Sequence, residues 1–127
     1  MNQRSYYFAV DLGATSGRTI IGSITDGKLE LEELTRFDNA IIETGGHFYW
    51  DIFALYNEII KGLKLVAQRG LKITSIGIDT WGCDFVYVGK DNAILRTPVA
   101  YRDPHTEGIM QQYFDEKIDR QTVYDKT

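Results

Sequence analysis

The sequence contains few of the residues that mark disulfide-stabilised or zinc-binding proteins. Cysteine occurs once and histidine twice in 127 residues, so no disulfide can form within the chain, and the chain lacks the four Cys or His ligands of a structural zinc site. A single cysteine is typical of proteins in a reducing compartment. The sequence therefore predicts a cytoplasmic protein that folds around a hydrophobic core.

Long hydrophobic runs and clusters of basic residues are also missing. No stretch approaches the roughly 18 apolar residues of a membrane-spanning helix, and the N-terminus lacks the apolar run of a secretory signal. Lys and Arg number 14 against 18 Asp and Glu, for a formal net charge of −4. Nucleic-acid surfaces need concentrated Lys and Arg to neutralise phosphates. We therefore expect neither a membrane nor a nucleic acid as a partner.

The remaining composition is that of an ordinary globular domain, with 43% hydrophobic and 25% charged residues. Three runs near the N-terminus have strand character, and Gly-containing turns separate them. The first is apolar, the second is β-branched, and the third alternates in part through Leu29, Leu31 and Leu34. They predict three consecutive antiparallel strands, at 6–10, 18–24 and 28–37. No linker or repeat divides the chain, so we expect a single domain or part of one.

A helix and a further strand follow. Apolar residues recur at helical spacing over 51–69, where Asp51 can cap the first turn and Gly70 can end the last. The β-branched run at 72–79 comes after this crossover helix and should lie parallel in the same sheet. This order opens the ribonuclease-H-like fold that actin-type ATPase lobes share. We therefore predict an α/β fold of this kind with a mixed sheet, although other α/β folds share the pattern.

The rest of the chain gives weaker signals. We expect a loop over 38–46 and a turn over 89–92, where Gly, Asn and Asp gather. We also expect short extended segments at 85–88 and 99–101. Two helices, at 106–116 and 120–126, complete the prediction.

The first candidate site is the run Asp-Leu-Gly-Ala-Thr-Ser-Gly-Arg at 11–18, where an acid ends a buried strand and a tight hairpin follows. Backbone N–H groups of such a hairpin can point toward an anion, and Arg18 adds a positive fork for phosphate. Asp11 would tolerate a nearby phosphate only with a cation such as Mg²⁺ between them. A plain hairpin with a surface arginine is the alternative.

A second candidate site follows the predicted parallel strand, since ligands gather at the carboxyl ends of such strands. Gly82 lets a ligand approach the backbone, Trp81 offers an apolar face for a sugar, and Asp84 can accept hydroxyl protons. The alternative is a core tryptophan beside a turn, with the acids solvated. We interpret Cys83 as a small buried apolar residue rather than a nucleophile.

A third group of polar residues lies just before the predicted helix at 106–116. Arg102 and Asp103 could pair with each other or orient a substrate. His105 occupies a position that more often holds a surface or capping residue than a catalytic one.

Four runs of the sequence, taken together, resemble the FGGY carbohydrate kinases of the actin-like ATPase superfamily. They are AVDLGATSGR (9–18), FYWD (48–51), SIGIDTWGCDFV (75–86) and PVAYRDPHT (98–106). The last three runs resemble most the branch of the family that uses ATP to phosphorylate L-rhamnulose at O1. Related kinases of L-fuculose or xylulose are the nearest alternative.

The resemblance implies a role for each matching residue, with ATP and Mg²⁺ as cofactors and a sugar as the partner molecule. Asp11 would lie near the metal and the transferred phosphate. The ATP phosphate loop would consist of Ala14, Thr15, Ser16, Gly17 and Arg18. The sugar pocket would be formed by Gly82, Thr80, Trp81 and Asp84, with support from Arg102 and Asp103.

Members of the family are several times longer than this chain. The resemblance therefore implies that 1–127 form the N-terminal part of the first lobe, without the rest of that lobe or the second one. The aspartate that takes the proton from the sugar hydroxyl would lie beyond Thr127. A chain without that base is expected to be inactive on its own.

Two alternatives belong to other classes of protein. A ribonuclease-H-like nuclease would use Asp11, Glu58 and Asp79 as a two-metal carboxylate site, although the net charge of −4 disfavours it. A non-catalytic actin-like module, which binds partners or has lost activity, is the second alternative.

Overall fold

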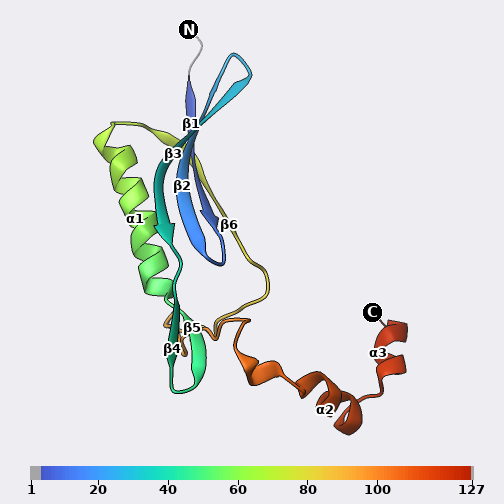
Figure 1. The fold of residues 1–127 in the computed structure, drawn as a ribbon. Helices are drawn as coiled ribbons and strands as arrows, with labels where there is room; N and C mark the ends of the chain where they lie inside the picture. The colour runs from blue at the N-terminus through green and yellow to red at the C-terminus, as the bar shows by residue number, and fades with distance from the viewer. Residues whose placement is uncertain (1–3, 127) are drawn as a thin grey trace.

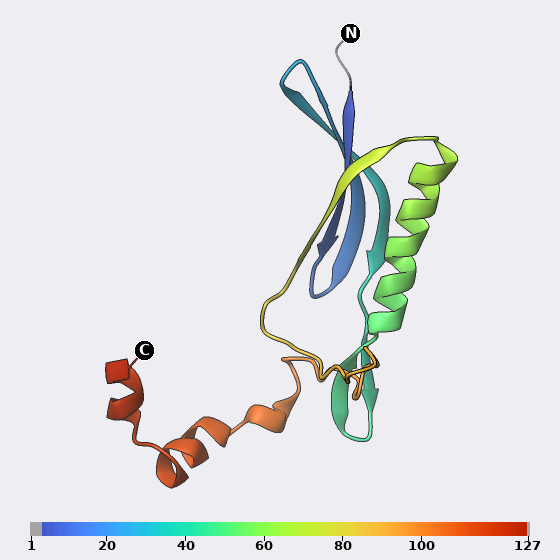
Figure 2. The ribbon, with the colours of Figure 1, turned by 180° about the vertical axis from the view of Figure 1, so that it is seen from behind.

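The computed structural model describes residues 4–126, so residues 1–3 and 127 of the expected domain lie outside the described range. A four-stranded sheet and one long helix form the body of the molecule (Figure 1). A separate two-stranded hairpin lies below this body, and a helical C-terminal segment extends away from it. Figure 2 shows the same arrangement from behind.

The four-stranded sheet has the order β3-β2-β1-β6. Its strands are β1 (Ser5–Leu12), β2 (Ser16–Thr25), β3 (Lys28–Asp38) and β6 (Ile73–Thr80). The first three pair antiparallel, and β6 lies parallel to β1, as predicted. Asp26 and Gly27 close the β2–β3 turn at φ values of 53° and 75°, which match the twist of the two strands.

Helix α1 (Ile52–Gln68) crosses from the hairpin back to the sheet and confirms the helix predicted at 51–69. The Oδ1 atom of Asp51 accepts a hydrogen bond from the backbone N–H of Ala54 at 2.9 Å, which satisfies one free donor of the first turn. Gly70 follows the helix at φ 65°, a left-handed conformation that glycine adopts without strain.

The hydrophobic core lies between α1 and one face of the sheet. Phe8 and Val10 of β1, Ile21 of β2 and Val66 of α1 form the buried cluster. Because side chains alternate between the two faces of a strand, Asp11 lies on the opposite face from Phe8 and Val10. The core therefore fixes which side chains of β1 face away from the helix.

Strand β6 continues this apolar face beyond the cover of the helix. Ile76 and Ile78 are in register with Phe8 and Val10, and so share their face of the sheet. Yet they are 53% and 58% exposed, because α1 packs over β2 and β3. The helix thus covers only part of the sheet.

The loop predicted over 38–46 is wrong for its second half. Strands β4 (Ile41–Thr44) and β5 (His47–Trp50) pair antiparallel around Gly45 and Gly46, both with positive φ. Most residues of β4 are exposed, so the segment lacks the apolar alternation that marks a half-buried strand. Two adjacent glycines between short runs were the available signal for this hairpin.

The segment between β6 and the C-terminal helices is mostly irregular. The strand predicted at 85–88 is reduced to one isolated bridge, between Val88 and Ile94. The turn at 89–92 is confirmed by a hydrogen bond from the N–H of Asn92 to the carbonyl of Gly89 at 3.0 Å. The extended piece at 99–101 pairs with β5 through a bridge between Tyr49 and Val99.

The C-terminal segment contains a short 3₁₀ turn, η1 (Pro104–Thr106), and the helices α2 (Ile109–Glu116) and α3 (Arg120–Lys126). The helix predicted at 120–126 is confirmed. The one predicted at 106–116 begins later, because Gly108 adopts φ 76° and interrupts the backbone. None of the helices within residues 4–126 has the length and apolarity that a membrane crossing needs.

The close approach of α1 to the sheet at Gly62 gives a test of the packing. A Cβ atom at Gly62 would overlap the side chain of Thr19, which is fully buried and hydrogen-bonded to Thr35 at 2.6 Å. We expect Gly62→Ala to destabilise the fold by about 1–3 kcal/mol through overpacking, despite the helix propensity that alanine adds. Urea unfolding measures the change, with Gly77→Ala as control, where nothing lies within 4 Å. Equal stability of both variants would refute this packing.

Candidate functional site

The hairpin between β1 and β2 is braced by hydrogen bonds from the end of β3. The N–H of Gly13 donates to the carbonyl of Ser16 at 2.9 Å and closes the turn. The side chain of Asn39 donates to the carbonyl of Gly13, and its backbone N–H donates to Thr15, both at 2.9 Å. Sequence reasoning missed Asn39, which is 7% exposed. Its amide side chain at the start of the predicted loop over 38–46 was the only available signal.

Asp11 and Arg18 pair across the hairpin. They are register partners on β1 and β2, and both the Nε and Nη2 atoms of Arg18 donate to Oδ2 of Asp11, at 2.9 and 2.8 Å. Both side chains are about 42–43% exposed, and ion pairs in such positions contribute about 0–1 kcal/mol. A phosphate can therefore compete for the Arg18 guanidinium.

A second carboxylate lies beside Asp11. Asp79 of β6 is its register partner in the parallel pair, so both acids occupy the same face near the carboxyl ends of their strands. Mg²⁺ in phosphate-transfer sites is held by one or two carboxylates together with phosphate oxygens. These residues fit a magnesium ion that arrives with a nucleotide.

A metal site formed by protein side chains alone would need three or more ligands close together. Within residues 4–126, no group of three or more His, Cys, Asp or Glu residues is arranged to hold a metal ion. Glu58, the third acid of the nuclease alternative, pairs with Lys61 on α1 at 2.5 Å. The structure therefore gives no support to a two-metal nuclease site at Asp11, Glu58 and Asp79.

The turn after β6 is organised around Asp84. Its Oδ2 atom accepts hydrogen bonds from the indole N–H groups of Trp50, at 2.6 Å, and Trp81, at 2.8 Å. The two indole rings lie against each other with centroids 4.5 Å apart. Trp50 is the core tryptophan of the pair, 1% exposed, whereas Trp81 is half-buried. Trp50 is a further residue that sequence reasoning did not assign to the site.

The backbone at Gly82 is open to an approaching molecule. A Cβ atom there would meet nothing within 4 Å. Thr80, which ends β6, is exposed beside it. Cys83 is also exposed, so its interpretation as a buried apolar residue is wrong. Within this turn, Trp81 and Asp84 contact Trp50 of β5, whereas Gly82 and Cys83 are exposed.

Asp103 holds the segment before α2 against the β4–β5 hairpin. Its side chain is fully buried and accepts hydrogen bonds from the backbone N–H groups of Phe48, at 2.7 Å, and His105, at 2.8 Å. The Nδ1 atoms of His47 and His105 lie 3.1 and 2.8 Å from the carboxylate. Burial alone raises the pKa of Asp103, but these hydrogen bonds outweigh it and lower the pKa to about 2.

These contacts leave Asp103 a structural role in this segment. A carboxylate offers about four lone-pair positions, and protein donors already occupy those of Asp103. It therefore positions the surrounding segment and has no free acceptor for a sugar. Arg102 is exposed in contrast, and its Nε atom donates to the hydroxyl of Tyr101 at 3.1 Å.

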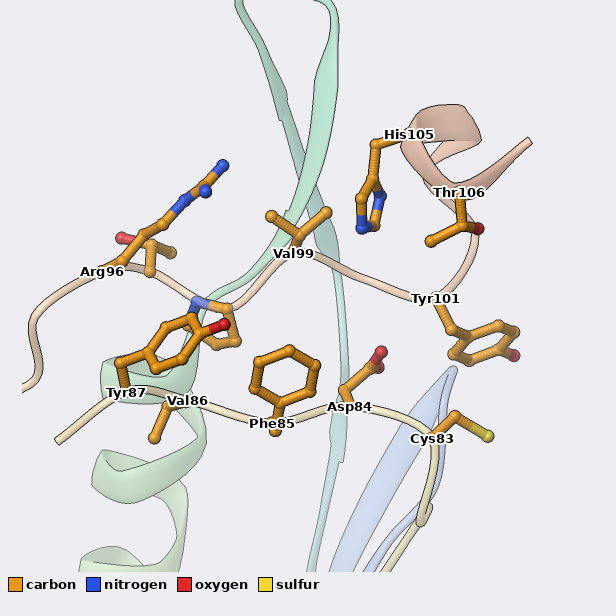
Figure 3. Close-up of a pocket in the computed structure, with 12 residues that line it drawn as sticks. Cys83, Asp84, Phe85, Val86, Tyr87, Arg96, Val99, Tyr101, His105 and Thr106 are labelled. Atoms are coloured by element: carbon orange, nitrogen blue, oxygen red, sulfur yellow. The ribbon is translucent and has the colours of Figure 1, made fainter. Parts of the chain in front are cut away.

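A cavity of about 410 Å³ lies between the turn after β6 and the segment before α2 (Figure 3). This volume is in the range of small-molecule sites. Of the residues expected at the sugar, Asp84 is the one that lines it. The other lining residues are Cys83, Phe85–Tyr87, Arg96–Val99, Tyr101, His105 and Thr106.

A solved carbohydrate kinase has the same fold. The gluconate kinase of Lactobacillus acidophilus matches with a TM-score of 0.73 at 17% sequence identity, over 94% of this chain and 24% of that one. At this identity the match shows the fold alone. The molecule thus has the predicted ribonuclease-H-like architecture of an actin-like ATPase lobe.

Sequence comparison defines the family. The model of the FGGY family of carbohydrate kinases, N-terminal domain, matches residues 6–127, and the chain belongs to that family. It is 65% identical over 121 residues to the rhamnulokinase of Bacteroides thetaiotaomicron and 44% identical over 119 residues to that of Oceanobacillus iheyensis. These alignments cover 95% and 94% of this chain, which spans 25% of the length of either relative.

The lowered pKa of Asp103 predicts how stability depends on pH. A group whose pKa falls on folding stabilises the folded state above its unfolded pKa, and loses that contribution as the pH falls through the folded value. We expect Asp103→Asn to unfold at lower urea concentration than the wild type at neutral pH. The difference in urea midpoint between the wild type and Asp103→Asn should decrease between pH 4 and about 2, as Asp103 becomes protonated.

Urea titrations from pH 7 to 2 measure this gap. Asp119→Asn is the matched control, because hydrogen bonds from Thr122 lower the pKa of this exposed carboxyl. Asp119 has no partner in β5 among the contacts described. A gap for Asp103→Asn that stays constant over this range would contradict the buried carboxylate.

Proposed function

We propose that this chain is part of an ATP-dependent transferase that phosphorylates L-rhamnulose to L-rhamnulose 1-phosphate in rhamnose catabolism. The observation that carries the proposal is the 65% identity with a rhamnulokinase, which extends over 95% of the chain. An alignment of this extent spans both the β1–β2 hairpin and the turn after β6. A kinase of L-fuculose or xylulose is the alternative within the family.

The β1–β2 hairpin is proposed to bind the phosphates of ATP. Backbone N–H groups and hydroxyls for this contact would come from Ala14, Thr15, Ser16 and Gly17. The guanidinium group of Arg18 would release Asp11 and donate its hydrogen bonds to a phosphate oxygen instead. Asp11 would then face a magnesium ion, with Asp79 beside it. Bound Mg²⁺ neutralises charge that develops on the transferred phosphoryl group. The exposed, exchangeable pair of Asp11 and Arg18 supports this assignment.

The turn after β6 is proposed to bind the sugar. Gly82 would contact the sugar through its backbone, and Trp81 would pack its ring face against it. The Oδ1 atom of Asp84 would accept a hydrogen bond from a sugar hydroxyl group. The open space at Gly82 and the two indole bonds that hold Asp84 support this assignment. Thr80 and Arg102 would border the site.

The position of the chain within the enzyme is also proposed. The curated relatives are about four times as long, so we assign 1–127 to the N-terminal part of the first lobe. The catalytic base would belong to a later part of the polypeptide. The single cysteine, which is exposed, supports a cytoplasmic location.

Arg18 tests the phosphate assignment in the full-length kinase that carries this sequence. Arg18→Ala should lower kcat with ATP about 10- to 100-fold, because hydrogen bonds to charged groups contribute about 1.5–3 kcal/mol. The KM for the ketose should change less than twofold. Arg4→Ala is the matched control, since Arg4 also forms an exposed ion pair on the sheet, with Glu30, at the end of the strands away from the hairpin. Equal kcat values for both variants would exclude Arg18 from the phosphate site.

Trp81 tests the sugar assignment in the same enzyme. Trp81→Ala should raise the KM for L-rhamnulose about tenfold and leave the KM for ATP unchanged, because the apolar face beneath the sugar is lost. Trp81→Phe, which keeps a ring but removes the bond to Asp84, should have a smaller effect. Steady-state kinetics with each substrate varied give both constants. If Trp81→Ala leaves sugar affinity unchanged, the sugar lies elsewhere.

A further inference from the structure

His105 lines the cavity of about 410 Å³ beside the sugar-binding turn. Figure 3 shows its ring between Val99 and Thr106, directed toward the space above Asp84. The side chain is 43% exposed, so one edge of the ring is accessible from the cavity. Sequence reasoning treated His105 as a surface or capping residue.

The contacts of His105 determine which ring nitrogen is free. Its Nδ1 atom lies 2.8 Å from Oδ1 of Asp103. With a pKa of about 2, Asp103 is ionised at neutral pH, and an ionised carboxylate can only accept. Nδ1 therefore carries the proton and donates it. In the neutral ring, Nε2 is then left with a free lone pair, which accepts a hydrogen bond.

The ring is also held in place from its own backbone. The N–H of His105 donates to the same Oδ1 atom at 2.8 Å, so one carboxylate oxygen fixes both the backbone and the side chain. Because this carboxylate is buried and its acceptor positions are filled, it cannot turn toward solvent. His105 therefore presents Nε2 in a preorganised position.

His47 shares the carboxylate but not the cavity. Its Nδ1 atom lies 3.1 Å from Oδ2 of Asp103, and its side chain is 46% exposed. His47 does not line the cavity. Both histidines contact Asp103, but only His105 lines the cavity. Substitution of each one can therefore distinguish a role in the cavity from a role in holding Asp103.

We propose that Nε2 of His105 accepts a hydrogen bond from a hydroxyl group of the sugar, and that Asp103 positions the ring for this contact. The inference rests on the proposed function, because it assigns a further ligand to the same sugar site. Asp84 lines the same cavity. A sugar between the two residues would have one hydroxyl fixed by each, which makes His105 a determinant of sugar specificity.

Two substitutions of His105 separate the roles of its nitrogens. The amide of His105→Asn reaches the position of Nδ1 and can still donate to Asp103, but nothing replaces Nε2. The amide of His105→Gln reaches the position of Nε2. In the full-length kinase, we expect His105→Asn to raise the KM for L-rhamnulose about five- to tenfold, as for one lost hydrogen bond. His105→Gln should raise it less, and the KM for ATP should stay within twofold in both.

His47→Asn is the matched control, because it alters the other imidazole partner of Asp103. We expect its KM for L-rhamnulose to equal that of the wild type. Equal rises for His47→Asn and His105→Asn would show that His105 acts only through Asp103, and would overturn the proposal. An unchanged KM for His105→Asn would overturn it as well.

A binding measurement separates this proposal from the proposed function. The NMR signal of the His105 Cε1–H group should shift when L-rhamnulose, L-fuculose or xylulose is added, and that of His47 should not. If no sugar moves the His105 signal, the His105 site is wrong even in an active kinase. A shift without turnover on any of the three sugars would overturn the kinase function and leave the binding site in place.

Discussion

The buried carboxylate of Asp103 joins two parts of the chain that are 55 positions apart. An ionised group out of water is tolerated only when donors satisfy it, and those donors come from both β5 and the turn that follows Asp103. Neither segment can shift without leaving the charge unpaired. The irregular stretch that walls the cavity therefore has a defined position, although few regular elements surround it.

Strand β5 supports the proposed sugar site in two ways. Its residue Phe48 donates to Asp103, and its residue Trp50 donates to Asp84. The backbone of the same strand pairs with the segment at 98–100. One short strand thus fixes both the carboxylate that holds His105 and the carboxylate proposed to contact the sugar. The four-stranded sheet carries the β1–β2 hairpin that is proposed to bind phosphate, and the smaller β4–β5 hairpin supports the proposed sugar site.

The sequence predicted the parts of the fold that depend on local periodicity. Helix α1 and the parallel strand β6 follow from apolar spacing and crossover geometry, and the capping role of Asp51 follows from its position. The β4–β5 hairpin was missed because each strand has only four residues, and those of β4 are mostly exposed. The roles of Asp103, Trp50 and Asn39 depend on partners more than 20 positions away. Such pairings leave no periodic trace in the sequence.

The pairing of Asp11 with Arg18 limits which ligands the β1–β2 hairpin can accept. An anion that binds Arg18 without a cation would lie beside the Asp11 carboxylate and be repelled by its negative charge. A cation that binds Asp11 without an anion would be repelled by Arg18 in the same way. Only a ligand that brings both charges at once can exchange with the pair and leave every charge matched. If the hairpin binds ATP as proposed, the charge of the ligand alone would favour the metal complex of the nucleotide over the free nucleotide.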